Sequence, residues 1–264
     1  MQNRRRSAVC LILGIMLPSL AAFVTADDVA ETTATIDPPT ATNQYQTTQL
    51  HGWTLKINPA IEAADPDLLA ATLNELATQL NAIAEVIPPL ALARIRQIEI
   101  WIELEMPKTA CMCYHVSRDW LIPNGYNADK EGAVEIGNAR TFLEWTKNQP
   151  WMVLHELAHG YHDQVFGYDE PTITDAWRRI KHSGVYDSVG HISGKPRKHY
   201  ALTNQMEWFS ETTEAFYGMN DFYPHTRSEL HKADPDGAAL VQRLWEKSPL
   251  PEPKRDTLEE SDQK

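Results

Sequence analysis

The chain has 264 residues, of which 23% are charged and 42% apolar, as in an ordinary globular protein. Its length allows one sizeable domain with a buried core. The formal net charge of −12 argues against nucleic acid as a partner, because nucleic-acid binding needs a basic face.

The first 26 residues have the layout of a secretory signal peptide. Three arginines at positions 4–6 precede an apolar run at 8–24, which is interrupted by Pro18 and is short for a membrane span. We expect cleavage after Ala26, which changes the formal charge from −12 to −15 because three arginines and no acids are removed. The mature protein is then expected outside the membrane, in the periplasm or the extracellular medium. The alternative is an uncleaved N-terminal anchor.

Residues 27–48 are rich in Thr, Ala and Pro, which predicts a disordered linker. One catalytic domain is expected over 49–249, followed by a flexible tail at 250–264. The sequence contains no internal repeat that would indicate a second domain, and we expect a monomer.

The first half of this domain predicts a small sheet and one long helix. Apolar and polar residues alternate in two segments, and a third segment is short and apolar. These predicted strands are 53–57, 97–104 and 133–136. Leucines and isoleucines recur at helical spacing over 65–87, where Pro88 ends the helix. Residues 107–131 are expected to be irregular.

The second half is predicted to be mainly helical. The predicted helical segments are 141–146, 150–164, 175–181, 204–217 and 238–247.

Residues 155–159, His-Glu-Leu-Ala-His, form an H-E-x-x-H motif in a predicted helix. Residues four apart lie on one helical face, so the imidazoles of His155 and His159 can bind one metal ion. Glu156 lies beside that face, where it can accept a proton from a metal-activated water. The alternative is a helix whose histidines are ordinary polar surface. The apolar neighbours favour the metal, because burying such groups without partners costs free energy.

The residues after the motif exclude one class of third ligand. In the longer pattern H-E-x-x-H-x-x-G-x-x-H, a glycine and a third histidine follow, but this chain has His162 and Val165 at those positions. His162 lies on the ligand face, yet it is about 10 Å along the helix from His155. We expect His162 to be a polar neighbour of the site and not a ligand.

Three glutamates on a later predicted helix, Glu207, Glu211 and Glu214, share one face at i, i+4 and i+7. Metal binding by one of them and orientation of a ligand histidine by another would explain this arrangement. Asn204 and Glu207 also have the spacing of a capping box, so the alternative role of Glu207 is to cap the helix.

Cys111 and Cys113 are the two cysteines that remain after signal cleavage. A disulfide between such near neighbours is strained, and both a strained disulfide and two thiols stay open. A metal role is disfavoured, because such a site would need more thiolates nearby.

Residues 200–211, Tyr-Ala-Leu-Thr-Asn-Gln-Met-Glu-Trp-Phe-Ser-Glu, resemble the second metal helix of gluzincins of the anthrax lethal factor type. That pattern has a tyrosine, then Thr-Asn, a glutamate ligand seven residues after the tyrosine, two aromatics, a small residue and a second glutamate. The stretch 149–159, Gln-Pro-Trp-Met-Val-Leu-His-Glu-Leu-Ala-His, also resembles a group of secreted bacterial and fungal zincin-like proteins. The resemblance covers less than half of the chain.

The resemblance implies a zincin-like α+β fold, in which a small mixed sheet with an edge strand lies over the H-E-x-x-H helix and the second half is mainly helical. It implies that zinc is bound by His155, His159 and Glu207. It also implies that Tyr200 donates a hydrogen bond to the developing oxyanion or acts as an acid, and that Glu211 orients a ligand histidine.

The predicted function is therefore that of a secreted zinc metallopeptidase, with Zn²⁺ as cofactor and a peptide or protein as substrate. Asn138 and Ala139 resemble the Asn-Ala pair that contacts substrate backbone in thermolysin-type enzymes. The substrate is expected to extend along the strand 134–136, as the edge of the sheet. The alternatives are a catalytically inactive zincin-like binding or structural protein and a zinc hydrolase of a non-peptide amide, such as a cell-wall cross-link.

Overall fold

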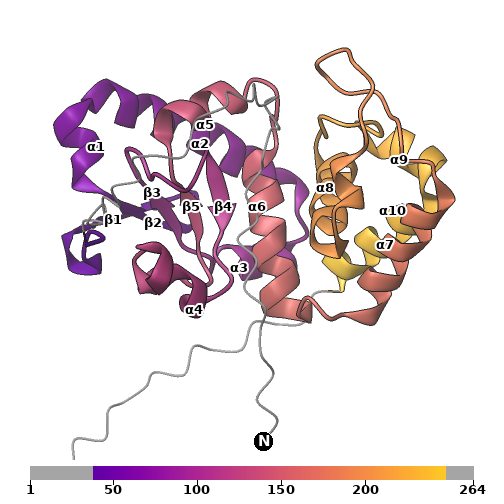
Figure 1. The fold of residues 1–264 in the computed structure, drawn as a ribbon, viewed down its shortest axis with the longest axis horizontal. Coiled ribbons are helices and arrows are strands. Elements are labelled where there is room, and N and C mark those ends of the chain that lie inside the picture. Colours follow the sequence, from indigo (N-terminus) through magenta and orange to yellow (C-terminus); the bar gives the residue numbers. More distant parts are fainter. Residues whose placement is uncertain (1–37, 248–264) are drawn as a thin grey trace, which may run out of the picture.

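The computed structural model describes residues 38–247, which form two halves with one helix between them (Figure 1). Within this range, a five-stranded mixed sheet with its helices is followed by a mainly helical half. Helix α6, Met152–Tyr161, contacts strand β4 on one side and helix α8, Gln205–Tyr217, on the other. The predicted α+β class, with a sheet followed by helices, is confirmed.

The strand order in the sheet is β1-β2-β3-β5-β4. Strands β2, β3 and β5 are parallel, whereas β1 and β4 pair antiparallel with β2 and β5. The strand bounds are β1 Gln46–Leu50, β2 Trp53–Ile57, β3 Ile100–Ile102, β4 Met112–Tyr114 and β5 Val134–Ile136. The other α-helices are α1 Pro59–Ala64, α2 Pro66–Val86, α3 Pro89–Ile95, α4 Arg118–Leu121, α5 Ala139–Trp145, α7 Pro171–Ser183, α9 Arg227–Ala233 and α10 Pro235–Glu246.

The edge of the sheet differs from the prediction. Strand β5 lies between β3 and β4, so the expectation that residues 134–136 form the edge was wrong. The edge strand next to α6 is β4, which falls in the stretch 107–131 that was expected to be irregular. All three residues of β4 are buried, so the strand lacks the polar alternation by which a half-buried strand is recognised.

Secondary structure begins earlier than the sequence predicts. A 3₁₀ turn at Thr42–Gln44 and strand β1 both start within the predicted linker 27–48. The predicted signal peptide, residues 27–37 and the tail 250–264 lie outside the described residues. Among the helices of residues 38–247, none is both long and apolar enough to cross a membrane.

One face of the sheet packs against α6 and carries the apolar core. Ile100, Val134 and Ile136 are fully buried there. A Cβ atom on Gly160 of α6 would lie 2.6 Å from Ile98 Cδ1 and 3.0 Å from an atom of the Tyr114 ring. Because glycine has no side chain, α6 can lie close to the edge strand at the turn that carries the motif.

The other face of the sheet holds a buried group of charges. Lys130 Nζ lies 2.6 Å from Glu103 Oε1 and also contacts Glu135 of β5. Tyr45 donates its hydroxyl proton to Glu103, and the Asn58 amide donates to the other oxygen of the same carboxylate, both at 2.6 Å. These five side chains are buried, so the sheet has one apolar face and one ionic face.

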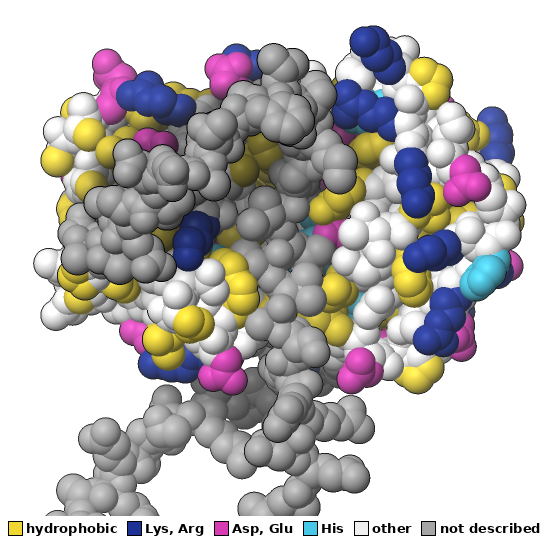
Figure 2. All heavy atoms as spheres, viewed as in Figure 1, with side chains coloured by type: hydrophobic (Ala, Val, Ile, Leu, Met, Phe, Trp, Pro, Cys, Tyr) yellow, Lys and Arg dark blue, Asp and Glu magenta, His cyan; other side chains and the backbone are white. Residues whose placement is uncertain are grey.

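Figure 2 shows the molecular surface from the same side. The Lys and Arg side chains visible over the helical half are spaced apart by hydrophobic and neutral atoms.

We predict that Lys130→Met destabilises the protein by about 3–5 kcal/mol, because two buried carboxylates then lose their shared cation. Urea unfolding measures this free energy. The matched control is Lys147→Met, since Lys147 pairs with Glu144 on the surface and its side chain is 64% exposed. That change is expected to cost about 1 kcal/mol or less. Equal effects of the two substitutions would refute the importance of the ionic face.

Candidate metal centre

The H-E-x-x-H motif lies on α6, and every residue of this helix is buried. The sequence predicts a helix over 150–164; the α-helix ends at Tyr161 and continues as one π-helical turn, His162–Phe166. Since α6 lies between the sheet and α8, its histidines and glutamate need partners inside the protein.

Three side chains converge where α6 faces α8. The Nε2 atoms of His155 and His159 are 3.1 Å apart. Glu207 Oε2 lies 3.1 Å from the first Nε2 atom and 3.3 Å from the second. All three residues are at least 97% buried, and they form one of three groups in residues 38–247 with the donors and spacing to hold a metal ion.

The separations of the three donor atoms fit a metal ion. Tetrahedral coordination with bonds of about 2.0–2.1 Å, as for zinc, places nitrogen and oxygen donors about 3.3–3.4 Å apart. In addition, Glu207 Oε1 has no hydrogen-bond partner among the described residues although it is buried. A buried carboxylate oxygen without a partner is costly, and a metal ion beside it would remove that cost.

The charges at this cluster favour a bound cation. Burial raises the pKa of Glu207, but His159 and His155 outweigh burial and lower the pKa to about 2. Burial lowers the pKa of His159. Glu207 is therefore ionised and His159 neutral at pH 7, which are forms that bind a metal. Burial lowers the pKa of His155, but Glu207 and Glu214 outweigh burial and raise it well above the usual range, so a metal ion would displace a proton from this imidazole.

Helix α8 also contacts the Nδ1 atoms of both imidazoles. His155 Nδ1 lies 2.6 Å from Glu214 Oε1, and His159 Nδ1 lies 3.1 Å from Ser210 Oγ. When each Nδ1–H donates to its partner on α8, each Nε2 lone pair points to the cluster. The sequence predicts Glu207 as a ligand or as a helix cap; its side chain lies in the cluster, while Asn204 caps the helix.

The carboxylate nearest to His155 Nδ1 differs from the one that the resemblance implies. Glu214 is at 2.6 Å, whereas Glu211, the residue expected to orient the histidine, is at 3.8 Å. Glu211 instead accepts a hydrogen bond from Asn220 at 2.9 Å and lies 3.7 Å from His199 Nδ1. The sequence predicts that both glutamates lie on one helical face. Which of them contacts His155 could not be predicted, because that depends on the rotation of α8 against α6.

Glu156 lies between α6 and the edge strand. Its Oε2 atom accepts a hydrogen bond from the backbone N–H of Tyr114 at 2.9 Å, and its side chain is buried. The edge strand thus positions the carboxylate that follows the first histidine of the motif. Sequence reasoning missed Tyr114, since a backbone donor leaves no trace in residue type.

Two tyrosines lie close to the cluster. Tyr200 is the first residue of the 3₁₀ turn Tyr200–Leu202, which precedes α8. Burial, followed by the charges of Glu207 and Glu156, raises the pKa of its hydroxyl. Tyr168, which sequence reasoning missed, donates to the carbonyl oxygen of His159 at 3.3 Å. The structure therefore places the predicted Tyr200 near the candidate ligand Glu207.

His162 lies away from the three donor atoms. Its ring is fully buried against the rings of Tyr168 and Phe209, and neither of its nitrogens has a hydrogen-bond partner within residues 38–247. Burial lowers the pKa of His162 to about 3. The imidazole is thus neutral and packs among aromatic rings instead of polar groups.

Asn138 and Ala139 follow the interior strand β5 and begin helix α5. The Asn138 side chain caps α5 by accepting from Thr141 N at 2.9 Å. The backbone N–H groups of Asn138 and Ala139 already donate to Cys111 and Leu104. These residues therefore lack the open strand edge that the resemblance implies for substrate contact.

We predict that Glu214→Ala weakens metal binding by about 10–100-fold, because His155 loses the group that orients its ring. Glu211→Ala, which removes the more distant carboxylate of the same helix, is expected to weaken binding less. Competition with a chromogenic chelator measures both affinities. The opposite order of effects would mean that Glu211 is the orienting residue.

Comparisons with protein-family models, with curated proteins and with solved structures found no match to this chain. The interpretation of the centre therefore depends on its own geometry. Two imidazoles and one carboxylate converge in a buried place, with a second glutamate beside them on α6 and a tyrosine near the converging carboxylate.

Proposed function

We propose that the protein is a secreted zinc metallopeptidase that hydrolyses peptide bonds, with His155, His159 and Glu207 as the zinc ligands. The observation that carries this proposal is the convergence of three buried donor atoms at 3.1–3.3 Å, next to Glu156 of the same motif. Two histidines and a carboxylate are a ligand set typical of catalytic zinc. Secretion is proposed from the signal-like residues 1–26.

Zinc, when bound, lowers the pKa of a water molecule toward 7 and polarises a carbonyl group. Glu156 accepts the proton of the attacking water and passes it to the leaving amine. The hydrogen bond from Tyr114 N keeps this carboxylate at the side of α6 that faces the edge strand, where a substrate would arrive. A zinc site with a purely structural role has no use for such a base.

Tyr200 stabilises the oxyanion that forms when water attacks the carbonyl. The charge of Glu207 acts on its hydroxyl, so the hydroxyl lies near the ligand set and can donate to an oxygen there. The raised pKa keeps the hydroxyl protonated at neutral pH, as a donor must be. His199 N-caps the turn that carries this tyrosine, by accepting from Ala201 N at 3.1 Å.

The substrate is proposed to add a strand to the outer edge of β4. The backbone groups of Cys111 and His115 bond inward to the β5 side, so the groups of Met112 face outward by strand alternation, as does the Tyr114 N–H that donates to Glu156. A peptide bound there in extended form would run past Glu156 and the ligand set. The strand proposed to bind the substrate is therefore β4, and not the predicted strand 134–136.

We predict that Glu156→Gln retains the wild-type zinc content and lowers peptide hydrolysis by at least about 10²–10⁴-fold, because the amide cannot accept the proton. Mass spectrometry of a mixed peptide library detects cleavage, and elemental analysis measures zinc. Glu144→Gln on the surface of α5 is the matched control and should cleave like the wild type. Cleavage by Glu156→Gln at the wild-type rate would refute the assigned role, and a zinc-loaded wild type that cleaves no peptide would favour the non-catalytic or non-peptide alternative.

We also predict that Tyr200→Phe lowers the rate of hydrolysis by about 10²–10³-fold and leaves zinc bound, because one oxyanion donor is lost. Tyr217→Phe is the control: its buried hydroxyl has no hydrogen-bond partner among the described residues, so its loss should leave the rate unchanged. The rate constant at saturating peptide distinguishes the two. A normal rate for Tyr200→Phe would remove this residue from the mechanism.

A further inference from the structure

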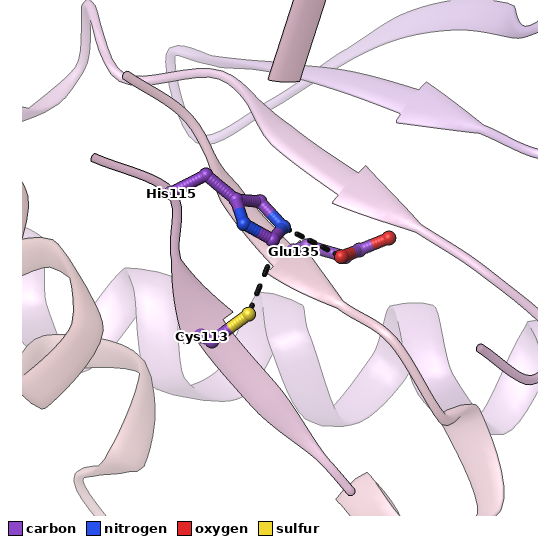
Figure 3. A group of neighbouring side chains, drawn as sticks. All are labelled: Cys113, His115 and Glu135. Carbon is purple, nitrogen blue, oxygen red and sulfur yellow. Dashed lines mark hydrogen bonds and ion pairs between the residues drawn. The ribbon is translucent and has the colours of Figure 1, made fainter. Parts of the chain in front are cut away.

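A second group of potential metal ligands lies on the ionic face of the sheet, away from α6 (Figure 3). Cys113 of β4 and Glu135 of β5 are directly paired in the strand register, so their side chains project from the same face. His115 follows Cys113 by two residues and points to that face as well. The neighbours Met112 and Tyr114 point to the opposite, core-facing side.

The three side chains converge closely. Cys113 Sγ lies 3.7 Å from His115 Nε2, and the same nitrogen lies 2.6 Å from Glu135 Oε2. A sulfur and a nitrogen bound to one tetrahedral zinc are expected about 3.6 Å apart, from bond lengths of about 2.3 and 2.0–2.1 Å. The sulfur and nitrogen thus have the spacing of two ligands. The carboxylate would move by roughly 0.8 Å from its hydrogen bond to reach the third position.

The position is deeply buried, with 2%, 2% and 0% of Cys113, His115 and Glu135 exposed. The ring of Tyr126 lies 5.3 Å from the imidazole, and Lys130 contacts the other oxygen of Glu135. Placing a thiol, an imidazole and a carboxylate together in such a place costs free energy unless all of them are satisfied. An apolar sheet face would avoid this cost, so the polar group calls for a functional reason.

The buried charges can accommodate a divalent ion. Around Lys130 lie two carboxylates, Glu103 and Glu135, which leave one negative charge beside His115 and Cys113. Without a metal, a protonated His115 balances this charge in its ion pair with Glu135. A divalent ion that binds a thiolate and a neutral imidazole adds one net positive charge and balances it. Thiolate and imidazole donors together select a borderline ion such as zinc over magnesium or calcium.

We propose that Cys113, His115 and Glu135 bind a second transition-metal ion, with zinc as the expected metal. The site is closed to solvent, and its three protein ligands would leave one of the four zinc positions to another donor. It would tie the edge strand β4 to β5 on both sides of Tyr114, the residue whose backbone N–H holds Glu156. The sequence disfavours a metal role for these cysteines, because too few thiolates lie near one another along the chain. The structure supplies the other donors, His115 and Glu135, through the pairing of β4 with β5.

The test is zinc stoichiometry of the purified protein and three variants. We expect two zinc ions per chain in the wild type and one in Cys113→Ser. Cys111→Ser is the matched control, since Cys111 is a buried thiol on the same segment that contacts Met152 instead, and it should keep two ions. Glu207→Ala should also keep one ion, because it disrupts only the centre on α6.

Cobalt substitution identifies the ligands directly and applies to the wild type, so it does not depend on whether Cys113→Ser folds. A near-ultraviolet thiolate-to-cobalt charge-transfer band is expected in the wild type and in Glu207→Ala. Absence of the band in the cobalt-loaded wild type, or an equal zinc content with and without the Cys113 thiol, overturns the proposal. If the band is present and Glu207→Ala binds as much zinc as the wild type, the result supports this second site and refutes zinc binding by Glu207.

Discussion

The contact between α6 and α8 is the interaction on which the candidate site depends. Helix α8 supplies the third donor of the cluster, Glu207, and it also supplies Ser210 and Glu214, which hold the Nδ1 atoms of the two histidines. Ser210 and Glu214 are four residues apart on one helix, as the two histidines that they contact are on the other. A shift of α8 by one residue would break all of these contacts at once, so the packing of the helical half determines the chemistry of the motif.

The sheet contributes to the site through its edge. Gly160 permits α6 to approach β4, and this approach brings Glu156 within hydrogen-bond distance of Tyr114 N. The same three-residue strand carries Cys113 on its other side, where the buried charges of the ionic face lie. One short strand therefore separates the two groups of potential ligands, and its position matters to both. Since a three-residue strand has few backbone bonds of its own, contacts of its side chains on both faces stabilise it.

Much of this arrangement could be predicted from local patterns. The helix 65–87, the strands 53–57 and 133–136 and the helix 204–217 each have a clear period or cap, and the structure confirms them with shifted ends. The H-E-x-x-H spacing predicted that His155 and His159 share a face, and the structure places them 3.1 Å apart at Nε2. Strand β4, the choice between Glu211 and Glu214, and the group around Cys113 were not predictable in this way. Each depends on pairing between segments far apart in the sequence, and in β4 full burial removes the alternation that marks a strand.

The central claim, that α6 and α8 together form a zinc site, is tested most directly by diffraction from crystals of the zinc-loaded protein at the zinc absorption edge. We predict an anomalous peak between His155 Nε2, His159 Nε2 and Glu207, at bond lengths of about 2.0–2.2 Å. A zinc-loaded crystal without a peak at this position, in which the three side chains only hydrogen-bond to one another, would contradict the proposed centre and the hydrolytic function that depends on it.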